Sequence, residues 1–390
     1  MRNGYVRVLA LVATAIAVVS LLPLSKAQSS DYTMTFLVQN KPDGDMTYEL
    51  KMTIPSALYQ YYAARDGLIF SEGDFAKFVT PDTFKPVADQ LWQISNDSED
   101  FTNSVLMLVH QIAYQEIVPS QYPVQTLVEG NGDCDLFATI AASILEAGGI
   151  NTILLYYKDK LHMEIGVQLP ELPLDGRVNV VSVTYLNSPY YVGETTGGQW
   201  RTGWRIGECP TDYQGVSAMV IPLERHEEPF MGQVSASIRP LDPSTLSLQV
   251  SSGIMFENNQ VILTGQILPE MSNENVTLKA KINSDIWTDI ATVPTQGNGR
   301  FEYRWVPPTG GSISVQAGWV GNSQLNGARS GEASVIVLPM FVVGMIAASA
   351  LAIAIAAVAF LKTKRKKPEP ILTEYNSASV INGTNAPHIS

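Results

Sequence analysis

The chain has 390 residues, more than one hydrophobic core usually organises, so we expect two or three domains. Its formal net charge of −12 excludes the basic surface on which nucleic-acid binding depends. With only two cysteines, Cys134 and Cys209, it is not a disulfide-dense scaffold, although one disulfide between them would suit an oxidising compartment.

Residues 1–27 have the composition of a secretory signal peptide. A basic start with Arg2 and Arg7 precedes an uncharged apolar stretch, and small residues end the segment at the spacing of a cleavage site. We therefore expect the mature protein to begin near Gln28, outside the cytoplasm.

Residues 28–81 predict a β-hairpin followed by a helix. The segments 33–38 and 48–54 alternate as strands do, and the Pro-Asp-Gly sequence between them is typical of a turn. The tyrosine- and alanine-rich residues 59–65 favour a helix, whose tyrosines we expect to pack rather than bind a ligand.

Residues 82–229 predict a domain of helices followed by strands. Apolar residues of 98–117 recur at helical spacing, and His110 falls off that stripe, so we expect its side chain in solvent. A second, almost wholly apolar helix is predicted at 134–147, where a Gly-Gly pair ends it. Four strands rich in β-branched and aromatic residues follow, at 152–157, 163–169, 178–185 and 190–193.

Cys134 opens the second of these helices, directly after the sequence Gly130-Asn-Gly-Asp. Backbone N–H groups at a helix start favour negative charge, so this position predicts a reactive thiolate. A cysteine nucleophile needs a base, and His162 at the start of a strand is well placed for it, whereas His226 lies in a charged linker. Glu194 ends a later apolar strand and is a candidate to orient the imidazole.

Residues 235–334 predict an all-β domain. Seven short segments are separated by turns rich in Pro, Gly and Asn, at spacings near a dozen residues, which is typical of an Ig-like β-sandwich. The expected strands are 246–250, 261–267, 276–282, 287–293, 301–305, 313–319 and 333–337. Because this domain lies next to the predicted membrane span, we expect it to act as a spacer.

Residues 335–361 carry no charge and, at 1.5 Å per residue, are long enough to cross a bilayer core of about 30 Å. Five Lys and Arg follow at once, so the positive-inside rule places the tail 362–390 in the cytoplasm. We expect a single-pass protein of the plasma membrane with the rest of the mature chain outside. This ectodomain keeps 17 of the 25 Lys and Arg and 35 of the 37 Asp and Glu, a formal charge of −18.

Three blocks of this sequence resemble the transglutaminase-like superfamily, in the secreted or membrane-bound form found in archaea and bacteria. They are Gln-Tyr-Pro-Val-Gln-Thr-Leu-Val-Glu-Gly-Asn-Gly-Asp-Cys-Asp-Leu-Phe-Ala, beginning at Gln121, then His-Met-Glu-Ile-Gly-Val, beginning at His162, and Glu-Thr-Thr, beginning at Glu194, with Gly-Trp-Arg-Ile-Gly-Glu at 203–208. The resemblance implies an α+β fold with a papain-like core and a Cys-His-Asp triad.

Carried over residue by residue, the resemblance makes Cys134 the nucleophile and His162 the base. Glu194 stands where the family usually has aspartate, and Gln121 matches a glutamine that could donate to an oxyanion. The sequence itself contains no metal cluster, phosphate loop or dinucleotide fingerprint, so we expect no cofactor.

Two functions remain open at this point. The first is a membrane-anchored thiol enzyme that acts on amide or peptide bonds of a protein or peptide substrate through a thioester. The second is a surface binding or adhesion protein without activity, in which Cys134 is joined to Cys209 by a disulfide. Nothing in the sequence indicates an oligomeric state.

Overall fold

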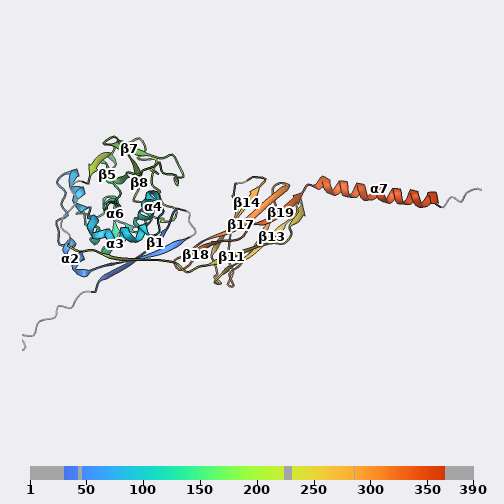
Figure 1. Ribbon diagram of the computed structural model, residues 1–390, viewed down its shortest axis with the longest axis horizontal. Coiled ribbons are helices and arrows are strands. Elements are labelled where there is room, and N and C mark those ends of the chain that lie inside the picture. Colours follow the sequence, from blue (N-terminus) through green and yellow to red (C-terminus); the bar gives the residue numbers. More distant parts are fainter. Residues whose placement is uncertain (1–29, 43–45, 224–230, 285, 365–390) are drawn as a thin grey trace, which may run out of the picture.

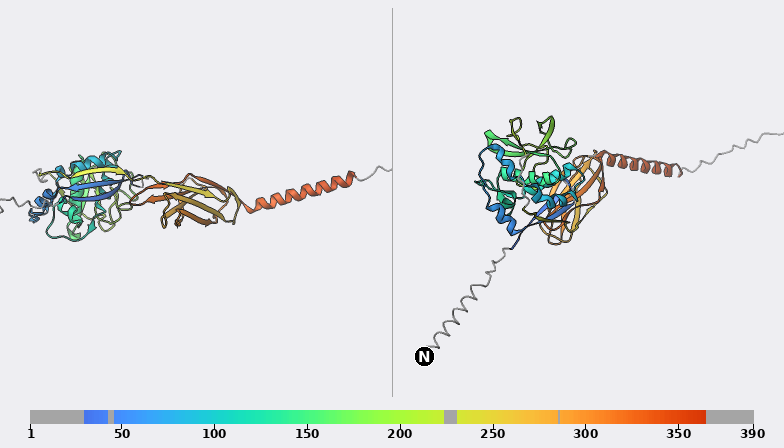
Figure 2. Two further views of the ribbon diagram at one scale, coloured as in Figure 1. Left: turned by 90° about the horizontal axis from the view of Figure 1, so that it is seen from below. Right: turned by 60° about the vertical axis from the view of Figure 1, so that its left-hand side comes forward.

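The computed structural model describes residues 30–42, 46–223, 231–284 and 286–364. Figure 1 shows three parts in a row: a mixed helix-and-sheet part that we call the head (residues 30–241), an all-β part that we call the sandwich (residues 245–338), and one long helix. The left view of Figure 2 shows the same succession from below. The predicted signal peptide, His226 and most of the predicted tail lie outside the described residues.

Helix α6 (Cys134–Ala147) forms the centre of the head. Every residue from Leu136 to Leu145 is buried, as expected for a helix that is apolar on all sides. The helix ends where predicted, because a Cβ on Gly148 would lie 2.4 Å from the Phe101 ring and Gly149 has a φ of +80°.

Further helices surround α6 and contribute to the same hydrophobic core. Helix α4 (Ser98–Val109) is capped by Asp97, whose carboxylate accepts a hydrogen bond from the Asp100 N–H at 2.9 Å, and it ends earlier than the predicted helix. The helical segments of the head besides α6 are α2 (Ser56–Ala63), η1 (Glu72–Phe78), α3 (Pro81–Trp92), α4 (Ser98–Val109), α5 (Pro123–Glu129) and η2 (Lys158–Lys160).

A five-stranded antiparallel sheet covers one side of α6, in the order β7-β8-β6-β5-β9. Strands β5 and β6 contact α6 directly. The strands are β5 (Thr152–Tyr157), β6 (His162–Val167), β7 (Ser182–Tyr185), β8 (Ser188–Gly193) and β9 (Met219–Pro222). A short parallel pair, β3 (Ala113–Tyr114) and β4 (Asn131–Gly132), precedes the cysteine.

The predicted N-terminal hairpin forms from β1 (Tyr32–Gln39) and β2 (Thr47–Ile54). A third strand, β10 (Ser235–Pro240), pairs with β2, although sequence analysis had placed these residues with the sandwich. The reason is a long-range pairing: the chain returns after the five-stranded sheet and closes the hairpin, so 28–81 and 82–229 share one core.

The sandwich contains two sheets, β11-β13-β16 and one built around β12-β19-β17-β14-β15, with β18 paired to β17. The seven expected strands are present, and sequence analysis missed β12 and β18. The strands are β11 (Thr245–Val250), β12 (Ile254–Phe256), β13 (Val261–Leu268), β14 (Asn275–Ile282), β15 (Thr288–Pro294), β16 (Arg300–Trp305), β17 (Gly311–Gly321), β18 (Asn326–Arg329) and β19 (Ala333–Leu338).

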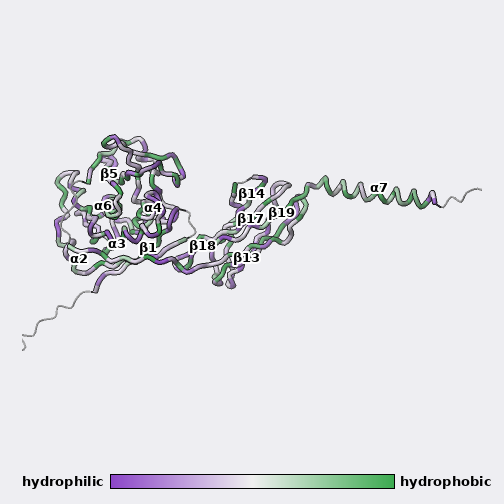
Figure 3. Tube along the Cα trace, viewed as in Figure 1, coloured by the Kyte–Doolittle hydropathy of each residue, from purple (hydrophilic) through white to green (hydrophobic). Residues whose placement is uncertain are grey.

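Helix α7 (Met340–Lys364) is long and apolar enough to span a membrane, with a mean hydropathy of 2.6 over its best window. Figure 3 shows it as an almost unbroken apolar helix extending away from the sandwich. It begins five residues later than the predicted span, because Val335 and Val337 are buried in the sandwich as part of β19.

Candidate active site

Cys134 is the first residue of α6 and follows a tightly packed glycine turn. Strand β4 in this turn pairs with β3, and a Cβ on Gly132 would lie 2.9 Å from Thr126. The half-buried thiol faces the start of β6, with its Sγ 3.9 Å from the Leu161 carbonyl oxygen and close to the Met163 N–H. The cysteine therefore lies beside the backbone on either side of His162.

The surroundings of Cys134 oppose ionisation, contrary to the expected effect of a helix start. Burial raises the pKa of the thiol to about 12, and the nearby Asp135 and Asp133 carboxyls add to the rise. Hydrogen bonds from the backbone N–H groups of Met163 and Asp135 lower the pKa of the thiol, but by less than burial and the carboxyls raise it. At neutral pH the resting thiol is therefore protonated, and a base must remove its proton.

His162 and Glu194 form a buried hydrogen-bonded pair. The imidazole Nε2–H donates to Glu194 Oε2 at 2.8 Å, which leaves Nδ1 free of this bond. The other carboxylate oxygen accepts from the Thr196 N–H at 2.6 Å and from its hydroxyl at 2.7 Å. Burial alone would raise the pKa of Glu194, but these hydrogen bonds and the His162 charge lower it, so Glu194 is a carboxylate at neutral pH.

His110 is buried, although sequence analysis placed it in solvent. Helix α4 is packed on all sides, so falling off one apolar stripe does not expose a residue. Its Nε2–H donates to the backbone carbonyl of Glu194 at 2.9 Å, and burial lowers its pKa. A Cβ on Gly203 would lie 2.4 Å from the ring, so the loop after Glu194 packs closely against this histidine.

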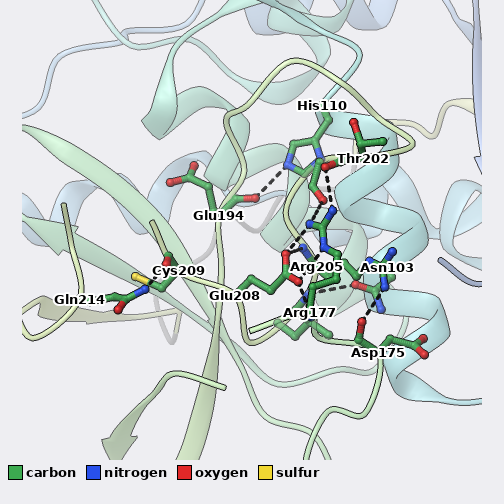
Figure 4. Close-up of polar contacts among 12 residues, drawn as sticks. Asn103, His110, Asp175, Arg177, Glu194, Thr202, Arg205, Glu208, Cys209 and Gln214 are labelled. Atoms are coloured by element: carbon green, nitrogen blue, oxygen red, sulfur yellow. Dashed lines mark hydrogen bonds and ion pairs between the residues drawn. The ribbon is translucent and has the colours of Figure 1, made fainter. Parts of the chain in front are cut away.

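An ion pair fixes the loop that follows Glu194, as Figure 4 shows. The Arg177 guanidinium contacts both carboxylate oxygens of buried Glu208, at 3.0 and 2.6 Å, and also donates to the Gly203 carbonyl at 2.7 Å. Burial would raise the pKa of Glu208, but Arg177 and two backbone N–H groups lower it. This ion pair gives Glu208, the last residue of the resembling blocks, a structural role.

Several further side chains surround the His162 ring. Tyr213 stacks on it, with ring centroids 4.2 Å apart and an angle of 7° between planes. Glu164 on the same strand is fully buried, and its Oε2 accepts a hydrogen bond from the Tyr157 hydroxyl at 2.7 Å. One signal for Glu164 was visible in the sequence: it is an acidic residue two positions after His162, on the same face of an otherwise apolar strand.

Donor atoms of His162, Glu164 and Glu194 lie within 4.8 Å of one another. Nitrogen and carboxylate donors can bind a divalent cation, but two ligands of one zinc ion, each bound at about 2.0–2.1 Å in tetrahedral geometry, lie about 3.3 Å apart. The 2.8 Å separation of His162 Nε2 and Glu194 Oε2 is that of a hydrogen bond, so we interpret this group as a hydrogen-bonded cluster.

Gln121, the candidate oxyanion donor, does not point its amide N–H toward this cluster. Its Nε2 donates to Glu129 Oε2 at 2.8 Å, and its buried Oε1 accepts no hydrogen bond within the described part of the chain. The backbone N–H groups of the first turn of α6 are the alternative hydrogen-bond donors to an oxyanion, because the Asp133 side chain does not cap this turn.

The two cysteines are both free, so the disulfide considered from the sequence is absent. Cys209 is buried against Glu164, with Sγ 3.9 Å from Oε1. Cys209 belongs to a small hydrophobic cluster formed by side chains of β5 and β8. Cys134, by contrast, packs against the main hydrophobic core of the head. Burial raises the pKa of the Cys209 thiol to about 12, so it too is protonated.

A cavity of about 520 Å³ lies beside His110 and next to the segments that carry Glu194 and Cys134. Its lining includes Thr195, which follows Glu194, and Phe137, one turn after Cys134. Tyr114, also in the lining, has a pKa raised first by burial and then by the neighbouring Cys134. The cavity therefore borders both the segment after β8, which carries Glu194, and the helix that carries the cysteine.

No protein-family model and no curated protein sequence matches the chain. Weakly similar solved structures include a suspected cysteine protease from Cytophaga hutchinsonii, at 14% identity and a TM-score of 0.23, over 50% of this chain and 62% of that one. Another is the CARDB domain of a Pyrococcus furiosus protein, at 14% identity and a TM-score of 0.18, over 25% of this chain and 90% of that one. At such scores these likenesses carry no functional argument.

Proposed function

We propose that the protein is a membrane-anchored, transglutaminase-like cysteine enzyme that cleaves or transfers amide or peptide acyl groups outside the cytoplasm. The observation that carries the proposal is the pair His162 and Glu194, joined at 2.8 Å: His162 begins β6, whose start faces the Cys134 thiol, and Glu194 directly follows the neighbouring strand β8. A nucleophile, a base and an orienting carboxylate are the parts that thiol acyl transfer requires.

In the first step His162 removes the Cys134 proton as Sγ attacks the substrate carbonyl. Because the thiol is protonated at rest, the proton moves during the attack, and Glu194 stabilises the imidazolium that forms. The negative carbonyl oxygen develops next to the uncapped first turn of α6, whose N–H groups favour it.

In the second step the imidazolium gives its proton to the nitrogen of the leaving group. The C–N bond then breaks, an amine departs, and the acyl group remains on Cys134 as a thioester. Water or a second amine then attacks the thioester, with His162 again accepting the proton of the nucleophile, and the thiol is regenerated. Tyr213 stacked on the ring limits how far the imidazole turns between these steps.

The cavity suggests where the substrate binds. The described residues that line it include no Asp, Glu, Lys or Arg, and burial keeps His110 neutral. Such a lining suits an uncharged part of a protein or peptide substrate. With α7 in the membrane and the positive-inside orientation, the head would stand beyond the sandwich, away from the bilayer.

Trapping of the thioester tests the proposal. The full chain in detergent is incubated with a mixture of peptide amides, and Cys134 is examined by mass spectrometry for an acyl adduct that hydroxylamine removes. We expect the adduct in wild type and in Cys209→Ser, and its loss in Cys134→Ser. An adduct that persists in Cys134→Ser, or a wild type that never acquires one, would argue against the proposal.

Alkylation gives a second measurement that needs no substrate. Because burial raises the pKa of the Cys134 thiol to about 12, labelling of Cys134 by iodoacetamide at pH 7 should depend on proton transfer to His162. His162→Ala should therefore slow labelling at least about 10-fold, from the usual contribution of a general base. Equal labelling rates in the two proteins would show that His162 does not serve the cysteine.

A further inference from the structure

Glu164 is a buried carboxyl group that the proposed reaction does not use. It occupies the middle of β6, between apolar residues, and none of its surface is exposed. Apart from the neighbouring His162, no cationic side chain is paired with it among the described residues. A carboxyl group in such a place needs a physical reason.

The contacts of Glu164 come from several segments of the head. Tyr157 of β5 donates its hydroxyl to Oε2 at 2.7 Å, and the Cys209 thiol lies 3.9 Å from Oε1. The Glu194 carboxylate is a hydrogen-bond neighbour on the remaining side. The titratable groups that face it are Tyr157, His162, Glu194, Cys209 and Tyr213.

Two adjacent buried carboxyl groups cannot both remain ionised at little cost. Glu194 is the carboxyl of the pair that stays ionised, since it accepts hydrogen bonds from His162 and from Thr196. Glu164 has only the Tyr157 hydroxyl and a weak thiol donor, and burial together with the Glu194 charge raises its pKa to about 8. The proton of the pair therefore belongs on Glu164 at neutral pH.

We propose that Glu164 is a positioning residue of this site: its protonated carboxyl donates a hydrogen bond to the Glu194 carboxylate and holds that carboxylate against His162. Glu194 is then fixed from three sides, by Thr196 at Oε1, by His162 at Oε2 and by Glu164 beside it. The neutral donor also leaves the cluster with a single negative charge, which matches the single positive charge of the imidazolium.

The effect on catalysis rests on the proposed function, whereas the protonation of Glu164 does not. As the pH rises through about 8, Glu164 ionises, ceases to donate and repels Glu194. The orienting carboxylate is then displaced, so kcat should fall on the alkaline side. Glutamine at this position can still donate an N–H and cannot ionise.

Two variants and two measurements test the proposal, with Glu171→Gln, a change at an exposed residue of the same part, as the control. Glu164→Gln should retain kcat at pH 7 within about threefold and lose the alkaline limb near pH 8. Glu164→Leu should lower kcat about 10- to 100-fold at all pH values with little change in KM, as for loss of a group that orients a general base. Infrared spectra at pH 7 should show a protonated-carboxyl carbonyl band, part of which is lost in Glu164→Gln and kept in Glu171→Gln. Burial raises the pKa of Asp135 to about 7, so the Asp135 contribution to this band remains in all three proteins.

The outcomes separate the two proposals. If the Glu164 part of the protonated-carboxyl band is lost in Glu164→Gln, in a protein without acyl-transfer activity, the protonated Glu164 donor is supported and the proposed function is removed. An active protein in which Glu164→Leu keeps the wild-type kcat and pH profile overturns the role of Glu164 and leaves the function standing. Circular dichroism shows whether Glu164→Leu is folded. If Glu164→Leu does not fold, Glu164→Gln decides the question: an unchanged alkaline limb in its pH profile overturns the role of Glu164.

Discussion

The head and the sandwich bury different kinds of side chain. Among the described residues of 245–338, the buried polar side chains are Thr295, Asn326 and Ser330, none of which titrates. The head, by contrast, buries a set of acids, bases and histidines: Asp100, His110, Asp133, His162, Glu164, Glu194, Arg205 and Glu208. Burying such groups costs free energy, so their concentration in the head supports placing the proposed active site there.

The comparison also shows two ways of stabilising a buried polar group. Glu208 is held by a cation, Arg177, and its role is to fix a loop. Glu164 has no such cation among the described residues; the Tyr157 hydroxyl donates to it, and we propose that it is protonated and donates to Glu194. The first arrangement tolerates pH changes around neutrality, whereas the second changes state near pH 8, as a regulated or catalytic group would.

The largest expected effect concerns the head. Glu194→Gln should preserve the fold and lower acyl transfer by about 10- to 10⁴-fold, because a neutral amide no longer stabilises the imidazolium of His162. Cys134→Ala should abolish the reaction. Steady-state kinetics on the full chain measure both, and circular dichroism shows whether the fold is kept. Wild-type kinetics in Glu194→Gln would show that Glu194 has no role in the reaction, and the proposed roles of Cys134 and His162 would stand.

A core substitution in the sandwich should show the opposite pattern. Phe301 is 2% exposed, so Phe301→Ala should lower the free energy of unfolding by about 3–5 kcal/mol through lost contacts and a cavity. Acyl transfer at temperatures where the sandwich remains folded should be unchanged. Calorimetry of the full chain measures the first effect, with Ile254→Ala, at an exposed residue, as control. A loss of kcat in folded Phe301→Ala would mean that the sandwich takes part in the reaction.

Local sequence signals predicted the elements that carry the site. Helix α6 was predicted with its observed ends, since the glycine turn before Cys134 and the Gly-Gly pair after Ala147 are strong start and stop signals. Seven of the nine strands of the sandwich followed from their alternation and turns, all except β12 and β18. The pairing of His162 with Glu194 was proposed from the position of Glu194 at the end of an apolar segment and then from the resemblance, and it has the geometry that such a role requires.

Tertiary packing accounts for what the sequence did not predict. The burial of His110 depends on a loop more than 80 residues later, the pairing of β10 with β2 joins segments about 180 residues apart, and both are invisible to a periodicity argument. The protonated thiol of Cys134 results from the burial and carboxyls around it, which outweigh the helix-start effect. Glu164 stood out only as an acid in an apolar strand, and its meaning required knowing that Glu194 lies beside it.

The smallest expected effect lies where the two parts meet. Asn326, at the start of β18, is 5% exposed, and its Oδ1 accepts from the Thr47 N–H of the head at 2.6 Å while its Nδ2 donates to the Leu241 carbonyl at 2.7 Å. Asn326→Ala would leave both backbone groups buried without partners, at a cost of about 1–3 kcal/mol. We expect a lower unfolding temperature with kcat preserved, and no change in Asn259→Ala, at an exposed residue. If Asn326→Ala also shifts the pH profile of the reaction, the junction transmits strain to the cluster around Glu194, and the separation of a functional head from a structural sandwich fails.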